Sequence, residues 1–282
     1  MPHETRWWIQ PPGPDESLRS VLGRAAAMYE CSPDDLWGSL NKDAVEVCGD
    51  VEDPSCAAMC RMARALGVAP KVLRSHCSPD APWRLAPDAG ASYCPECWNE
   101  DIRSGRPRML RRSWRHVLRT HCPMHRLPLQ LARDTWATGS VRTHYPSCTF
   151  TLDERQTLDL IEDFGVTLEK SLYFREPWPS GWGASPAGAR SLITSVSFNL
   201  GRTRDFAPSH CVYARGNLSD LVHGPRRMLD PLRQPEWEAF RALGNPAVRR
   251  AAIWIAAWAL IPDLPEKFSP GRFPRHVVVL DS

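Results

Sequence analysis

The chain has 282 residues, a formal net charge of +3, and 43% hydrophobic and 24% charged residues, which is typical of a globular protein. The most apolar stretch, residues 251–261, is too short to span a bilayer. The N-terminus also lacks the basic and then apolar pattern of a signal peptide. We therefore expect a cytoplasmic protein without membrane segments, in which cysteines bind metal more often than they form disulfides.

The small net charge hides an uneven distribution along the chain. Residues 1–60 carry four basic and eleven acidic side chains, whereas residues 102–133 carry nine arginines and no acid. Arginine outnumbers lysine 31 to 4 over the whole chain, which a GC-rich genome alone would produce. The clustering of the arginines, rather than their number, therefore points to a functional role.

Helical patterns dominate the first third of the chain. Residues 14–30 place apolar side chains at helical spacing, and Ser32 is a good N-cap for a second helix. Within residues 55–77, one helix is expected to end at Gly67 and another to start at Pro70. This pair has the outline of a helix-turn-helix, although any corner between two helices gives the same pattern.

Two short motifs then place metal-ligating residues at matching spacing. "YCPECWNE" contains Cys94 and Cys97, and "THCPMHRLPL" contains Cys122 and His125. In each pair a proline follows the first cysteine and favours a tight turn whose N–H groups point back at the thiolate. The four residues form a Cys₃His set suited to tetrahedral, structural Zn²⁺, and chance pairing among ten cysteines is the alternative.

The insert between these two motifs combines apolar and basic residues. Its apolar side chains can pack together and leave the arginines on the other faces. These apolar residues are Met109, Leu110, Trp114, Val117 and Leu118. The arginines predicted to contact nucleic acid are Arg108, Arg111, Arg112, Arg115 and Arg119. The alternative is that they pair with the acidic first 60 residues, within one chain or across a homodimer.

The rest of the chain gives weaker signals. Residues 177–191 are rich in proline, glycine and serine and are predicted to form a linker, and residues 234–262 form two helices joined at Gly244-Asn245-Pro246. Cys56 and Cys60, with His76 and Cys77 further on, could bind a second metal, but the first two have the pattern of small apolar core residues. His144, Cys148, His210 and Cys211 are further candidate ligands without a recognisable spacing. No set of catalytic residues is recognisable, so we predict no catalytic residue and no enzyme.

Together these patterns predict a mainly α-helical fold with helix-turn-helix-like modules around a zinc-ribbon or zinc-finger segment. We expect an N-terminal helical domain over residues 1–90 and a zinc-finger segment over residues 91–150. A C-terminal, mainly helical domain is expected over residues 151–282.

Three stretches in this order resemble a known family. "ESLRSVLGRAA", "YCPECWNED" and "RRSWRHVLRTHCPMHRLPLQL" are similar to TniQ, the target-selection component of Tn7- and Tn5053-like transposons, over about residues 12–133. The Trp-Arg pair before the second metal motif is the most specific part. Many TniQ members carry another Cys-Pro-x-Cys-Gly motif downstream, where this chain retains only Cys148.

The resemblance implies a non-catalytic adaptor that binds DNA and an AAA+ ATPase of the TnsC/TniB class. In that role it would help to place the transposase at its target, and some members join a CRISPR effector complex. The arginines would then face DNA or an acidic surface of the ATPase. A stand-alone, zinc-dependent DNA-binding transcriptional regulator is the alternative function, and a nuclease with a zinc-stabilised loop is a weaker one.

Overall fold

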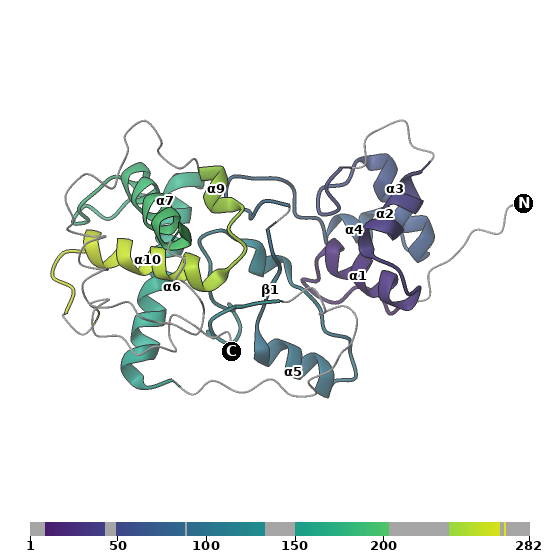
Figure 1. Cartoon of the computed structure of the whole chain (residues 1–282), viewed down its shortest axis with the longest axis horizontal. Helices are drawn as coiled ribbons and strands as arrows, with labels where there is room; N and C mark the ends of the chain where they lie inside the picture. Colours follow the sequence, from purple (N-terminus) through teal and green to yellow (C-terminus); the bar gives the residue numbers. More distant parts are fainter. Residues whose placement is uncertain are drawn as a thin grey trace, which may run out of the picture.

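The computed structural model describes residues 9–42, 49–87, 89–132, 150–202, 237–265 and 268, and it is mainly helical, as predicted. Figure 1 shows two helical lobes with a less regular middle segment between them. One lobe contains α1 (Leu18–Met28), α2 (Pro33–Asn41), α3 (Cys56–Leu66) and α4 (Pro70–Arg74). The other contains α6 (Leu152–Tyr173), α7 (Pro186–Arg202), α9 (Trp237–Arg241) and α10 (Pro246–Leu260). The middle segment contains β1 (Ser92–Tyr93), α5 (Pro95–Arg103), the 3₁₀ turn η1 (Arg112–Arg115) and β2 (Gln130–Leu131).

The N-terminal lobe begins its helices where the sequence supplies caps. The side chain of Ser17 caps α1, and that of Ser32 caps α2 as predicted. Gly67 ends α3 in the left-handed conformation with φ 65°, which glycine adopts without steric cost. The next helix, α4, has five residues and ends at Arg74, so it is shorter than the predicted stretch to residue 77.

One expectation for this lobe is wrong. Cys56 and Cys60 are exposed on α3 and take no part in the core. The buried residues of that helix include Met59, Met62 and Ala63. Spacing alone could not decide which small side chains are buried, because cysteines fit the apolar pattern as well as alanine does.

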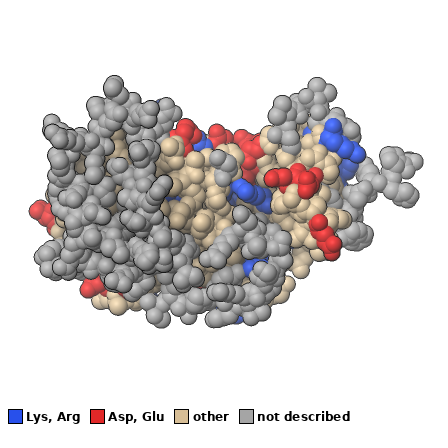
Figure 2. Space-filling view, viewed as in Figure 1, with Lys and Arg blue, Asp and Glu red and all other residues tan. Residues whose placement is uncertain are grey.

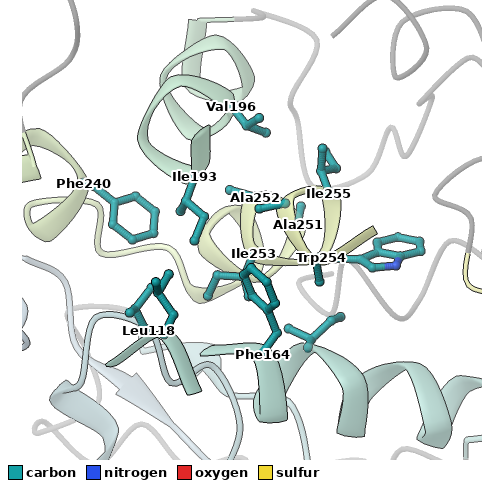
Figure 3. Packing of buried hydrophobic residues seen from close by; sticks show 14 of the residues in the cluster. Leu118, Phe164, Ile193, Val196, Phe240, Ala251, Ala252, Ile253, Trp254 and Ile255 are labelled. Atoms are coloured by element: carbon teal, nitrogen blue, oxygen red, sulfur yellow. The ribbon is translucent and has the colours of Figure 1, made fainter. Parts of the chain in front are cut away.

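The C-terminal lobe packs around the apolar helix α10. Figure 3 shows Ile193 and Val196 of α7, Phe164 of α6 and Phe240 of α9 around it. As the sequence predicted, α10 starts at the Gly244-Asn245-Pro246 junction, where the Asn245 side chain accepts a hydrogen bond from the Ala247 N–H.

The predicted linker over residues 177–191 is also wrong. α7 already begins at Pro186, and Trp178 and Trp182 pack against the core. The Trp182 ring stacks on Phe164 with ring centroids 5.1 Å apart, and the Trp178 ring meets Trp182 edge-on at 4.7 Å. The two tryptophans hold a stretch whose proline, glycine and serine content alone favours a flexible connection.

The middle segment connects the two lobes. All five predicted apolar residues of the insert are buried, but they do not share one face. Leu110 and Trp114 pack with the metal-ligating cysteines, whereas Val117 and Leu118 belong to the core of the C-terminal lobe. The insert can contribute side chains to two cores because its backbone is extended on both sides of the η1 turn and does not form a continuous helix.

Residues 108–119, hereafter the arginine segment, bond through the backbone to the N-terminal lobe on one side and to the stretch between α4 and β1 on the other. The Ser17 N–H donates to the Leu110 carbonyl at 2.9 Å on one side. On the other, the Leu85 N–H donates to the Arg115 carbonyl and the Val117 N–H to the Trp83 carbonyl, both at 2.8 Å. Because residues of two apolar clusters lie in this segment, the predicted division at residues 90 and 150 stays a prediction.

Candidate metal centre and arginine segment

The two Cys-Pro motifs lie in separate parts of the sequence and come together in the structure. β1 pairs antiparallel with β2, with Ser92 opposite Leu131 and Tyr93 opposite Gln130. This pairing lies just before the first motif and just after the second. The ligand atoms of Cys94, Cys97, Cys122 and His125 therefore all lie within 4.8 Å of one another.

The distances among these ligand atoms suit a single tetrahedral ion. His125 Nδ1 lies 3.3 Å from Cys97 Sγ and 3.6 Å from Cys94 Sγ, and Cys97 Sγ lies 3.6 Å from Cys122 Sγ. With Zn–S bonds of about 2.3 Å and Zn–N bonds of about 2.0 Å, tetrahedral zinc separates its ligand atoms by about 3.5–3.8 Å. The set can thus hold a metal ion, and the donor types match zinc.

The local backbone explains how each motif directs its side chains. Cys94 is the N-cap of α5, and Pro95 occupies the first helical position, so Cys97 lies one turn further on. The second motif forms a tight turn in which the Arg126 N–H donates to the Cys122 carbonyl at 2.8 Å, and Arg126 has φ 53°. Both arrangements are typical of metal-binding knuckles.

The thiols strongly influence one another. Hydrogen bonds from the Cys94 and Cys97 thiols, with backbone N–H groups of His125 and Met124, hold the pKa of Cys122 far below its ordinary value. The hydrogen bond to Cys122, together with burial, raises the pKa of Cys97 to about 12. Three buried thiolates would repel one another, so a divalent cation is the natural partner that lets all three ionise.

A carboxylate lies behind His125, the histidine of the candidate metal centre, and was not predicted from the sequence. His125 Nε2 lies 3.0 Å from a carboxylate oxygen of Glu100, while Nδ1 faces the three sulfurs. A carboxylate behind a ligating histidine fixes the tautomer and the ring orientation. The sequence signal was present, because Glu100 follows Cys97 at helical i+3 spacing and so shares its face of α5.

Two of the predicted nucleic-acid-binding arginines lie largely inside the protein. Arg115 is 6% exposed, and its guanidinium donates to the backbone carbonyls of Leu85, Ala86 and Ala89. Burial lowers its pKa to about 10. Arg111 is 11% exposed and donates to the fully buried Asp101 at 3.0 Å. These two guanidinium groups are occupied by internal partners.

The other three predicted arginines are more accessible. Arg119 pairs with Glu169 of α6 at 2.9 Å and is 30% exposed. Arg112 lies 3.5 Å from Asp15, with exposed fractions of 36% and 35%. This contact is of the kind that the internal-pairing alternative expected, since Asp15 belongs to the acidic N-terminal stretch. Arg108 lies over the Trp98 ring, 5.4 Å from its centroid.

Two buried arginines of α10 were not predicted from the sequence. Arg249 donates to the His116 and Val117 carbonyls, and Arg250 to the Thr120 and Leu129 carbonyls. Burial lowers the pKa of Arg249 to about 9. Their position at the start of a strongly apolar helix could have indicated burial. A buried arginine needs acceptors for its donors, so carbonyl partners would then be expected.

Some further candidate residues are not placed by the structure. His144, Cys148, His210 and Cys211 lie outside the described residues. Among the helices that are described, none is long and apolar enough to cross a membrane.

The fold and the site define a mainly helical protein with a Cys₃His cluster that could hold a metal ion. A family comparison makes this class more specific. The TniQ family model matches residues 8–129, so the chain contains a TniQ family domain over that range. The match covers α1 to α4, the arginine segment and all four ligand residues. TniQ proteins are non-catalytic transposition proteins, and the domain implies a role in target selection. Searches of curated proteins and of solved structures found no match.

Proposed function

We propose that this protein is a non-catalytic transposition adaptor that binds DNA. In this proposal it also binds an AAA+ ATPase of the TnsC/TniB class and so links the ATPase and the transposase to the target. A CRISPR effector complex is an additional partner in the family that the chain resembles. The observation that carries the proposal is the TniQ domain over residues 8–129.

The metal centre has a structural role in this proposal. Cys94, Cys97, Cys122 and His125 supply four protein ligands to one Zn²⁺, which leaves no open position for an activated water. The ion would instead hold β1, β2 and α5 together beside the arginine segment. A closed site of this kind fits an adaptor better than a hydrolytic enzyme.

The nucleic-acid part of the proposal rests on the predicted arginines that reach solvent. Arg108, Arg112 and Arg119 are partly exposed, while Arg111 and Arg115 hold the segment in place from inside. Arginine binds phosphate through planar, paired donors, so contacts of this kind give salt-dependent and sequence-neutral affinity.

The test is co-assembly from purified components. The protein is mixed with an AAA+ ATPase of the TnsC/TniB class from the same genome, with ATP and duplex DNA, and complexes are separated by size-exclusion chromatography. The adaptor proposal expects one complex containing the protein, the ATPase and DNA. DNA binding without any ATPase binding would favour the stand-alone regulator, and cleavage of the DNA would favour the nuclease.

A further inference from the structure

The corner between α3 and α4 is basic although the chain around it is acidic. Residues 54–79 contain no aspartate or glutamate, and they follow an N-terminal stretch that is rich in both. The same residues carry four basic side chains: Arg61, Arg64, Lys71 and Arg74. Figure 2 shows basic and acidic atoms in separate groups on the lobe that contains this corner.

The helix α4 turns nearly all of its side chains to solvent. Leu73 is fully buried and anchors the helix in the core of the lobe. Lys71, Arg74 and Ser75 are exposed, and Val72 is 41% exposed although it is apolar. The left-handed Gly67 sets the turn before α4 and so fixes the direction in which this surface points.

The charges of α4 are not neutralised within the described part of the chain. There, Lys71 and Arg74 form no ion pair, whereas Arg61 of α3 is held by the Asn41 side chain at 3.1 Å. Lys71 and Arg74 are three residues apart and therefore lie on the same face of the short helix. Two solvated cations on one face form an anion-binding surface.

This surface continues to the arginine segment. Arg112 Nη1 lies 3.5 Å from the carbonyl oxygen of Cys77, three residues after Arg74. Burial raises the pKa of the Cys77 thiol to about 11, as do Glu52 and Asp53, and the charges of Arg74 and Arg112 both oppose that rise. Arg112 therefore lies beside the residues that directly follow α4 in the chain.

Acidic residues border this surface. Asp15 lies beside Arg112, and Asp80 lines the same hollow as Arg112 and Cys77. Asp53 accepts a hydrogen bond from the Asp80 N–H at 3.1 Å, so these two acids lie together at one edge. The basic surface is therefore limited to α4 and Arg112, which makes its position on the molecule specific.

We propose that α4 and Arg112 form one composite surface that binds the phosphate backbone of duplex DNA, with Lys71, Arg74 and Arg112 as the phosphate-binding groups. The inference rests on the proposed function and names the DNA-binding surface within it. A major groove admits a helix, and the small exposed side chains Val72 and Ser75 let α4 approach the base edges closely. An acidic protein partner is the other ligand class, and the experiment below separates the two.

The experiment compares the full-length protein with the variant Lys71→Gln/Arg74→Gln. The control is Arg155→Gln/Lys170→Gln, which removes the same charge from exposed positions of α6. Binding to a fluorescein-labelled duplex of mixed sequence is measured by anisotropy across a salt series. We expect the α4 variant to bind on the order of tenfold more weakly at low salt, and the slope of log K against log salt to become shallower by about 0.9 for each phosphate that is no longer neutralised.

Three outcomes decide the inference. The expected result is weaker DNA binding by the α4 variant, with the control and the thermal melting of both variants unchanged. Arg112→Gln should then reduce the slope further. Equal DNA affinity for wild type, α4 variant and control would overturn the inference while leaving the adaptor proposal standing. Loss of ATPase binding by the α4 variant with unchanged DNA affinity would also overturn it and assign the surface to a protein partner.

Discussion

The Cys₃His set and the arginines share one stretch of chain, but they differ in how far along the sequence their interaction partners lie. Each half of the Cys₃His set is formed by residues three positions apart, and the two halves are joined by a short strand pair. The arginines of the same stretch obtain their partners from distant elements, as Arg119 does from Glu169. Local spacing therefore describes the Cys₃His cluster well and the surroundings of the arginines poorly.

The comparison teaches which kind of pattern carries functional information. A ligand pair works through a turn of four residues, and its chemistry depends little on the rest of the fold. An arginine can bind phosphate, pair with a carboxylate or donate to buried carbonyls, and only packing decides among these roles. Of the five predicted arginines, Arg115 donates to buried carbonyls and Arg119 pairs with a carboxylate.

The largest effect is expected at the metal centre. Cys97→Ser should remove the ion and unfold residues 91–132, because structural zinc contributes about 10–16 kcal/mol to folding of zinc-finger peptides. Metal analysis of the wild type should give about one Zn per chain. The measurements are metal content and thermal melting, with the exposed Cys60→Ser as the matched control.

The control should keep its metal and melt with the wild type, because Cys60 lies on the exposed face of α3. If Cys97→Ser retains full zinc and an unchanged melting curve, the ligand assignment is wrong.

The same difference between local and long-range interactions separates the features that the sequence predicts from those that it does not. Caps and turn residues gave the start of α2 at Ser32, the end of α3 at Gly67 and the start of α10 at Asn245. The linker prediction failed at Trp178 and Trp182, because composition does not report where a tryptophan packs. The buried Arg249 was missed because its acceptors are carbonyls more than a hundred residues away.

The contact between α6 and the arginine segment provides the second prediction. A Cβ added at Gly165 would overlap the Leu118 carbonyl oxygen, so glycine allows this close approach. Figure 3 shows Leu118 beside Phe164 at this contact. Gly165→Ala should cost about 3 kcal/mol of unfolding free energy, because neither backbone can move away without disturbing the core.

The matched control for that prediction is Gly38→Ala. Gly38 lies within α2, and a Cβ there meets no atom within 4 Å. This substitution should stabilise the protein by about 0.5–1 kcal/mol, since alanine favours the helix. Urea unfolding of both variants gives the comparison, and equal midpoints would show that α6 and the arginine segment are not tightly packed.

The smallest expected effect concerns the charges at the same contact. Burial alone would raise the pKa of Glu169, but the hydrogen bond from His116 and the charge of Arg119 lower it below its ordinary value of 4.5. A carboxyl group with a depressed pKa stabilises the fold above its unfolded pKa, and this contribution is lost as the pH falls through the folded pKa. Glu169→Gln should therefore cost about 2 kcal/mol near pH 7.

The difference between wild type and Glu169→Gln should shrink as the pH falls below about 4.5, because both proteins then carry an uncharged group at this position. Urea unfolding at a series of pH values measures it, and protonation of the metal ligands acts on both proteins alike. Glu176→Gln, which removes a surface carboxylate paired with Lys170, is the control and should change stability by at most about 1 kcal/mol. A difference that stays constant from neutral to acid pH would mean that the charge of Glu169 does not stabilise the contact. The pairing of Arg119 with Glu169 would then not explain how the arginine segment is held.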